Sequence, residues 1–302
     1  MHATESGLLT LSSGPLELQL VPPLGGSIAR FDYRTRRGER IPCLRGVEGK
    51  SSNPLDHACF PLVPFVNRVR GGRFVFRGRA VALRPNLVGD PNPLHGQGWL
   101  SPWEVESADA AEAELVLRHP PGEWPWSYEA RQHFSLNPEG LTLRLSCTNQ
   151  ADEPMPCGLG HHPYFPCTER TRIDTEVDCA WTVDEQVLPV EKVAAEGAYG
   201  LRDRLICGQN LDNGFGGWSG TARIETPGLP FRIELSSPEA RFLHIYSPRT
   251  GGVFAAEPVG HANAALNEPE EDWHSLGVRV LAPGETMSLS MCIDIVAATR
   301  CG

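Results

Sequence analysis

Hydrophobic and polar residues alternate one for one along several segments of the chain. Leu141, Leu143 and Leu145 alternate with Thr142 and Arg144. The same pattern recurs at residues 16–20, 29–33, 231–235 and 287–295. Alternation with a period of two is typical of strands that bury one face and expose the other. The pattern therefore predicts antiparallel sheets along most of the chain.

Turn-forming residues separate these segments. The 302 residues include 31 glycines and 27 prolines, whereas usual frequencies predict roughly 36 of the two together. Asn-Pro-Glu-Gly at residues 137–140 lies between two alternating segments and predicts a hairpin. Residues 191–205 are the one stretch that could form more than a turn or two of helix, although Gly197 and Gly200 interrupt it.

No linker, repeat or low-complexity segment divides the chain. Many strands need two packed layers to bury their inner faces. We therefore expect an all-β fold, a large antiparallel β-sandwich that forms one domain over residues 1–302.

Composition and charge narrow the range of partners. Forty per cent of the residues are hydrophobic and 21% are charged, as in ordinary globular proteins. The formal net charge of −10 disfavours nucleic acid, whose phosphates need a basic surface, and favours an uncharged or cationic small ligand. Residues 1–6 have no basic n-region, and no run of about 18 apolar residues occurs. We expect a soluble cytoplasmic protein that does not bind membranes.

Several common motifs are absent. The nine cysteines are scattered and contain no C-x-x-C pair, which predicts reduced thiols. A phosphate loop ending at residue 51 would need glycine at position 44, which is Leu44. The glycine-rich residues 213–220 have serine where a dinucleotide-binding motif needs its last glycine. Nucleotide binding and serine hydrolysis therefore lack their usual signatures.

Five segments place polar, ionisable groups among apolar or aromatic neighbours, and together they could line one concave face. They are residues 67–68, 94–96, 160–165, 211–213 and 256–258. His161 and His162 would point to opposite faces of a strand, so one ion could hardly bind both. The H-x-H spacing of a metal-binding strand occurs nowhere. We therefore expect no metal site.

Together these segments resemble the aldose 1-epimerase (galactose mutarotase) family. The motifs that carry the resemblance are Asn67-Arg68 before Gly71-Gly72, His95-Gly96 before Trp99, His162-Pro163-Tyr164-Phe165, Asp212 three residues before Phe215, and Glu257 followed by Asn263 and Asn267. The resemblance implies a galactose mutarotase-like supersandwich. It also implies an isomerase that interconverts the α and β anomers of an aldohexose such as galactose or glucose, with this small sugar as its partner.

Anomer exchange opens a cyclic hemiacetal and closes it from the other face. Opening needs a base at the C1 hydroxyl and an acid at the ring oxygen. The resemblance places the catalytic histidine at His162, and we assign His162 as the general acid and Glu257 as the general base. Reference pKa values of about 4.3 and about 6.5 allow a carboxylate beside an imidazolium near neutral pH. No electron or group is transferred, so we expect no cofactor.

Other residues of the motifs can bind the sugar. Asp212 can accept hydrogen bonds from hydroxyls, and Arg68 and His95 can donate them to sugar oxygens. These three, with Asn67, form the expected substrate-binding set. An aromatic ring beneath the apolar face of the sugar is also expected, and the candidates are Trp99, Phe165, Phe215 and Trp218.

Two departures from the family pattern leave the sugar open. His161 replaces an asparagine, and Pro258 follows Glu257 where galactose enzymes have threonine. One alternative is a hexose 6-phosphate 1-epimerase, which would need a basic pocket. Another is a carbohydrate-binding protein that has kept the sandwich without catalysis. His161 and His261 are expected to be mainly structural.

Overall fold

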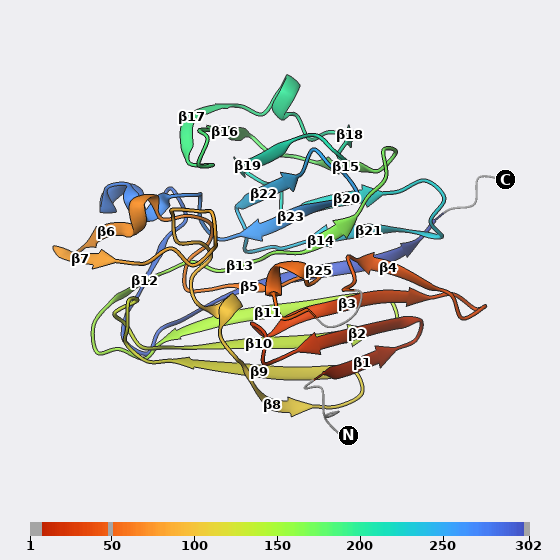
Figure 1. Cartoon of the computed structure of the whole chain (residues 1–302), viewed down its shortest axis with the longest axis horizontal. Coiled ribbons are helices and arrows are strands. Elements are labelled where there is room, and N and C mark those ends of the chain that lie inside the picture. The colour runs from red at the N-terminus through yellow and green to blue at the C-terminus, as the bar shows by residue number, and fades with distance from the viewer. Residues whose placement is uncertain (1–7, 48–50, 299–302) are drawn as a thin grey trace.

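The computed structural model describes residues 8–47 and 51–298 (Figure 1). Residues 1–7, residues 48–50 of the rejected phosphate-loop match and Cys301 lie outside the described residues. Within the described ranges the chain forms strands, turns and six short 3-10 helices, and no helix has the length and hydrophobicity to cross a membrane. The expected all-β fold is confirmed.

The larger of two main sheets has nine strands, each antiparallel to its neighbours. In spatial order they are β18 (Arg204–Leu205), β15 (Arg172–Thr175), β20 (Thr221–Glu225), β21 (Phe231–Ser236), β25 (Thr286–Ala297), β11 (Gly140–Asn149), β10 (Tyr128–Asn137), β9 (Glu112–His119) and β8 (Glu104–Ala108).

The second main sheet has eight strands and carries the candidate site. In spatial order they are β17 (Pro189–Ala194), β16 (Cys179–Val183), β19 (Leu211–Gly216), β22 (Phe242–Ser247), β23 (Val253–Val259), β13 (Gly160–His161) and β5 (Pro61–Leu62), while β14 (Tyr164–Pro166) also pairs with β23.

Smaller elements complete the fold. A four-stranded sheet contains β1 (Leu9–Ser13), β2 (Leu16–Val21), β3 (Ser27–Arg34) and β4 (Arg40–Leu44). Two further antiparallel pairs are the hairpin of β6 (Arg73–Phe76) with β7 (Arg79–Ala82) and the pairing of two distant segments, β12 (Met155–Cys157) with β24 (Arg279–Leu281). The 3-10 helices are Pro54–Asp56, Arg70–Gly72, Gly98–Leu100, Gly197–Tyr199, Ala265–Asn267 and Glu270–Asp272. Strands β1 and β2 lie against β10 (Figure 1).

The alternating pattern predicted the buried faces. Leu143 and Leu145 on β11 are buried and lie opposite Met291 and Leu289 on β25, which are buried too. Apolar side chains of both main sheets belong to one hydrophobic cluster, as expected of a sandwich. The predicted hairpin is also present, because Asn137 pairs with Gly140 between β10 and β11.

Residues 191–205, the stretch that could have formed a longer helix, do not form one. Strand β17 occupies its first part and pairs with β16, and a single 3-10 turn at Gly197–Tyr199 follows. Gly197 has φ 54°, in the left-handed region that a right-handed helix cannot use. The eight cysteines among the described residues are free thiols.

Candidate functional site

Neighbouring strands of the eight-stranded sheet bring four polar side chains to one face. Gly214 on β19 pairs with His244 on β22, which pairs with Glu257 on β23. Asp212 and Tyr246 pair with each other two residues further along the same strands. Side chains two residues apart share a face, so Asp212, His244, Tyr246 and Glu257 lie on the same side. They line a cavity of about 450 Å³, a volume typical of small-molecule sites.

His162 and Glu257 form a buried pair in this cavity. His162 lies between β13 and β14, and its backbone N–H donates to the Phe60 carbonyl. Its Nε2 is 3.2 Å from Oε1 of Glu257. The imidazole ring contacts Phe60 and Tyr164 at centroid distances of 4.6 and 4.5 Å. His162 Nδ1 and Glu257 Oε2 are buried and have no hydrogen-bond partner among the described residues.

Burial decides the ionisation of this pair. Burial, helped by the carboxylate of Asp212, raises the pKa of Glu257 well above its usual range. Burial, helped by His244, lowers the pKa of His162 to about 3. Burial therefore favours the uncharged form of each group. The uncharged pair and the carboxylate–imidazolium pair expected from reference pKa values both hold one proton.

A chain of hydrogen bonds orients Asp212. The Arg68 guanidinium donates to Oδ1 of Asn67 at 3.2 Å, which fixes the amide so that its Nδ2 donates to Nδ1 of His244 at 3.1 Å. The protonated Nε2 of His244 then donates to Oδ1 of Asp212 at 2.7 Å. Burial by itself would raise the pKa of Asp212, but the bond from His244 and the charge of Arg68 lower it. Asp212 is thus a carboxylate at the cavity wall.

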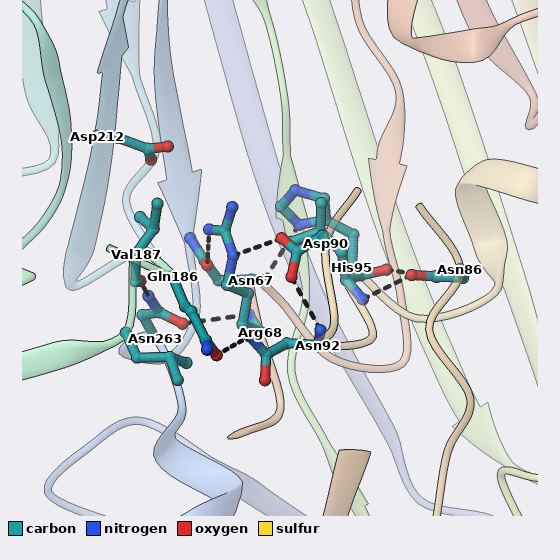
Figure 2. Close-up of polar contacts among 12 residues, drawn as sticks. Asn67, Arg68, Asn86, Asp90, Asn92, His95, Gln186, Val187, Asp212 and Asn263 are labelled. Atoms are coloured by element: carbon teal, nitrogen blue, oxygen red, sulfur yellow. Dashed lines mark hydrogen bonds and ion pairs between the residues drawn. The ribbon is translucent and has the colours of Figure 1, made fainter. Parts of the chain in front are cut away.

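Arg68 is held from two sides (Figure 2). Its Nε donates to Oδ2 of Asp90 at 2.8 Å, and the other oxygen of Asp90 accepts the backbone N–H of Asn92. The backbone N–H of Arg68 donates to the side chain of Asn263, whose amide in turn donates to the Val187 carbonyl. Because only 12% of the Arg68 side chain is exposed, its position at the cavity is largely fixed.

Backbone geometry aims His95 into the cavity. His95 and Asn67 both have φ in the left-handed region, at 60° and 54°. Gly96 follows at φ 71°, and a Cβ there would lie 2.2 Å from the Val63 carbonyl oxygen, so only glycine fits. Nδ1 of His95 accepts the backbone N–H of Asn67 at 3.1 Å. Burial, with the nearby His162 and Arg68, lowers the pKa of His95 well below its usual value, so its Nε2 carries the proton and can donate.

The structure brings all six sequence-predicted site residues to one cavity. They are Asn67, Arg68, His95, His162, Asp212 and Glu257. None of the four candidates for an aromatic ring beneath the sugar lines the cavity, and all are buried in the core: Trp99, Phe165, Phe215 and Trp218. The aromatic rings at the cavity are Tyr164 and Tyr246 instead.

The sequence analysis did not identify three ionisable residues of the cavity wall, His244, Tyr246 and Arg45. His244 and Tyr246 alternate with apolar residues on β22. Two polar residues on the same face of an otherwise apolar strand could have indicated that they line a site. Arg45 follows β4 and had no such signal. Its backbone N–H donates to the carbonyl of Tyr164 at 2.8 Å, so the contact between two distant segments brings it to the cavity.

His161 and His261 are structural. His161 points away from His162, and its Nε2 lies 3.4 Å from the Leu289 carbonyl oxygen. Nε2 of His261 accepts the backbone N–H of Val66 at 3.1 Å, and its Nδ1 bonds the Ala262 carbonyl at 2.8 Å. Both side chains are fully enclosed and neither lines the cavity.

Three cavity residues could also hold a cation. One ligand atom each from His95, His162 and Glu257 lies within 4.8 Å of the other two. Two imidazoles and a carboxylate are ligands that zinc accepts. The H-x-H spacing does not mark these three residues, because they come from three separate segments of the chain.

Comparisons with known proteins identify the family. Residues 8–294 match the sequence model of a family described as aldose 1-epimerase. The uncharacterized protein YphB of Escherichia coli K12 is 37% identical to this chain over 303 residues, which cover 95% of this chain and 98% of YphB.

Solved structures share the fold. The crystal structure of a protein described as a candidate aldose 1-epimerase from Escherichia coli K12 has a TM-score of 0.86 and 35% identity, and covers 96% of this chain and 99% of its own. A galactose mutarotase-like protein from Clostridium acetobutylicum has a TM-score of 0.85 at 20% identity, with 96% and 95% covered. The second similarity extends the shared architecture to a distant sequence.

Proposed function

The chain belongs to the aldose 1-epimerase family, and we propose that it interconverts the α and β anomers of an aldohexose by opening and reclosing the sugar ring. One observation carries the proposal. His162 Nε2 and Glu257 Oε1 lie 3.2 Å apart at the wall of a cavity of about 450 Å³. Since the C1 hydroxyl oxygen and the ring oxygen are bonded to the same carbon, two groups in contact can each reach one of them.

The proposed reaction moves two protons and breaks one bond. Glu257, as a carboxylate, takes the proton of the C1 hydroxyl while His162, as an imidazolium, gives a proton to the ring oxygen. The bond between C1 and the ring oxygen breaks, and C1 becomes an aldehyde carbon. The pair gives one proton and takes one, so its proton count is unchanged. After rotation about the C1–C2 bond, the reverse transfers close the ring on the other face.

The remaining residues would hold the sugar while C1 turns. The Asp212 carboxylate, held by His244, accepts from hydroxyl groups, and Arg68 and Nε2 of His95 donate to sugar oxygens. Asn67 bonds His95, Arg68 and His244. We therefore assign Asn67 mainly to positioning these groups.

Anomer exchange in solution tests the proposal. Freshly dissolved α-galactose, α-glucose and glucose 6-phosphate are followed by polarimetry and NMR, with and without protein. We expect the exchange rate of at least one sugar to rise in proportion to protein concentration, and to be unaffected by a chelator because no proposed step uses an ion. Binding without faster exchange would identify a carbohydrate-binding protein instead. Equal rates and no binding would exclude both.

The pH dependence of kcat/KM tests the role of the pair. The active pair holds one proton. Because the pKa of His162 is lowered to about 3, the pair does not take a second proton near pH 6.5. Because the pKa of Glu257 is raised, its proton is also retained above the usual range. We expect kcat/KM, corrected for spontaneous exchange, to be flat through pH 6.5. A limb with a midpoint near 6.5 would show that His162 titrates as an ordinary histidine.

A further inference from the structure

We propose that the aldose bound in this cavity carries an anionic group on C6, a carboxylate or a phosphate, and that Arg45 binds it. The inference rests on the proposed function, because it names the substrate class of the same site. It departs from the expectation that the overall charge of −10 favours an uncharged or cationic ligand.

Contacts on several sides hold the Arg45 side chain at the cavity wall. Its guanidinium carbon lies 3.8 Å from the centre of the Tyr164 ring. Its Nη2 donates to two backbone carbonyls, those of Leu55 and His57. These contacts fix the guanidinium in one place, so a ligand would bind a preorganised cation rather than order a flexible one.

Arg45 has no salt bridge among the described residues, although the more distant carboxylate of Asp56 favours its charged form. No carboxylate there lies within 4.0 Å of its guanidinium, whereas Arg68 on the same cavity is paired with Asp90 at 2.8 Å. Nε of Arg45 is buried and has no hydrogen-bond partner there. A half-buried cation that has no salt bridge is stabilised by an anion that reaches it. Burial accordingly lowers the pKa of Arg45.

The opposite charge lies elsewhere on the cavity wall. Asp212 is bonded to His244, and Tyr246 pairs with Asp212 across the two strands. The charges of both Asp212 and Arg45 act on Tyr246, which therefore lies within range of each. An anionic sugar would be repelled by Asp212 and attracted by Arg45. The cavity thus favours one orientation, with hydroxyl groups toward Asp212 and the anionic group toward Arg45.

The position of Arg45 relative to the acid–base pair selects C6. The Tyr164 ring contacts both the His162 ring, at 4.5 Å, and the Arg45 guanidinium, at 3.8 Å. His162 is proposed to act on the ring oxygen, whose other neighbour is C5, and C5 carries C6. With His162 at the ring oxygen, a group on C6 extends from the sugar on the side of His162. Arg45 lies on the same side, because it contacts the Tyr164 ring that also contacts His162. At a Debye length of about 8 Å, surface acids farther from Arg45 than Asp56 are largely screened.

Substrate comparison tests the inference. The kcat/KM for anomer exchange is measured for galactose and glucose, for galacturonate and glucuronate, and for galactose 6-phosphate and glucose 6-phosphate. We expect one anionic class to exceed the matched neutral sugar by about 10- to 100-fold, the value of a hydrogen bond to a charged group. The class that does so distinguishes a carboxylate from a phosphate.

Variants assign the effect to Arg45. Arg45→Met should bring the ratio between anionic and neutral sugars close to one, and Arg45→Lys should retain part of it. Arg73→Met, on the exposed face of β6, is the control and should leave the ratio unchanged. If Arg45→Met does not fold, the wild-type ratio and Arg45→Lys still decide.

The possible failures are distinguishable. Exchange of neutral sugars at least as fast as that of both anionic classes would overturn the inference and leave the proposed function intact. Absence of exchange with every sugar would overturn the proposed function. In that case the binding of galacturonate, galactose 6-phosphate and galactose to Glu257→Gln is measured by calorimetric titration. If neither anionic sugar binds more tightly than galactose, the inference is overturned as well.

Discussion

Glu257→Gln is expected to lower kcat/KM for anomer exchange by about 10²- to 10⁴-fold, the usual contribution of one positioned proton transfer. Glutamine has nearly the same size and can keep the contact with His162 Nε2, now 3.2 Å from Oε1. It cannot accept the proton of the C1 hydroxyl. Since Glu257 is 1% exposed and Gln adds no charge, we expect the fold to be retained, which circular dichroism and thermal unfolding can check.

A matched control and a double variant sharpen this experiment. Glu225→Gln makes the same change at an exposed position of β20 and should leave kcat/KM unaltered. If Glu257 and His162 act as one unit, the double variant Glu257→Gln, His162→Gln should be no slower than the slower single variant. An unchanged rate in Glu257→Gln alone would refute its assignment as the base.

The fold could be predicted because strand patterning is local. One face of each long strand is buried, so Leu143 and Leu145 carry the signal themselves. Residues 191–205 form no longer helix for a local reason, which Gly197 and Gly200 already indicate in the sequence. Gly197 adopts a left-handed φ. Pairing of β17 with β16 provides hydrogen bonds for the backbone N–H and C=O groups that would otherwise have bonded within a helix.

The site could be predicted only where family motifs mark it. Asp212 and Glu257 were found by resemblance, but His244, which connects Asp212 to Asn67, lies in an apolar strand with no motif around it. Its role depends on strand register, and a shift of one residue would turn its side chain to the other face. The pKa shifts of His162 and Glu257 could not be predicted from the sequence for a similar reason, because the depth of burial of both groups comes from tertiary packing.

Acid pH is expected to destabilise the protein steeply between pH 6.5 and 4. Burial lowers the pKa values of His161 and His261 from 6.5 to about 4. Below pH 6.5 these histidines are protonated in the unfolded chain but stay neutral in the folded protein. The free energy of unfolding is therefore highest above pH 6.5 and falls as the pH approaches 4. Each histidine then costs roughly 3 kcal/mol at pH 4, a large share of a typical total of about 5 to 15 kcal/mol. Unfolding in urea at a series of pH values measures the loss.

His161→Leu gives the cleanest test of this mechanism. Its Nε2 makes one long contact, 3.4 Å from the Leu289 carbonyl oxygen, and its Nδ1 has no partner among the described residues. The His161→Leu variant should therefore fold at neutral pH. Between pH 6.5 and 4, its free energy of unfolding should decrease by about 3 kcal/mol less than that of the wild type. His261 is unsuitable, because its ring bonds Val66 and Ala262 and its loss would destabilise the protein at every pH. His133→Leu, at an exposed position of β10, controls for the substitution. An identical pH slope in His161→Leu and wild type would mean that His161 does not drive the acid transition.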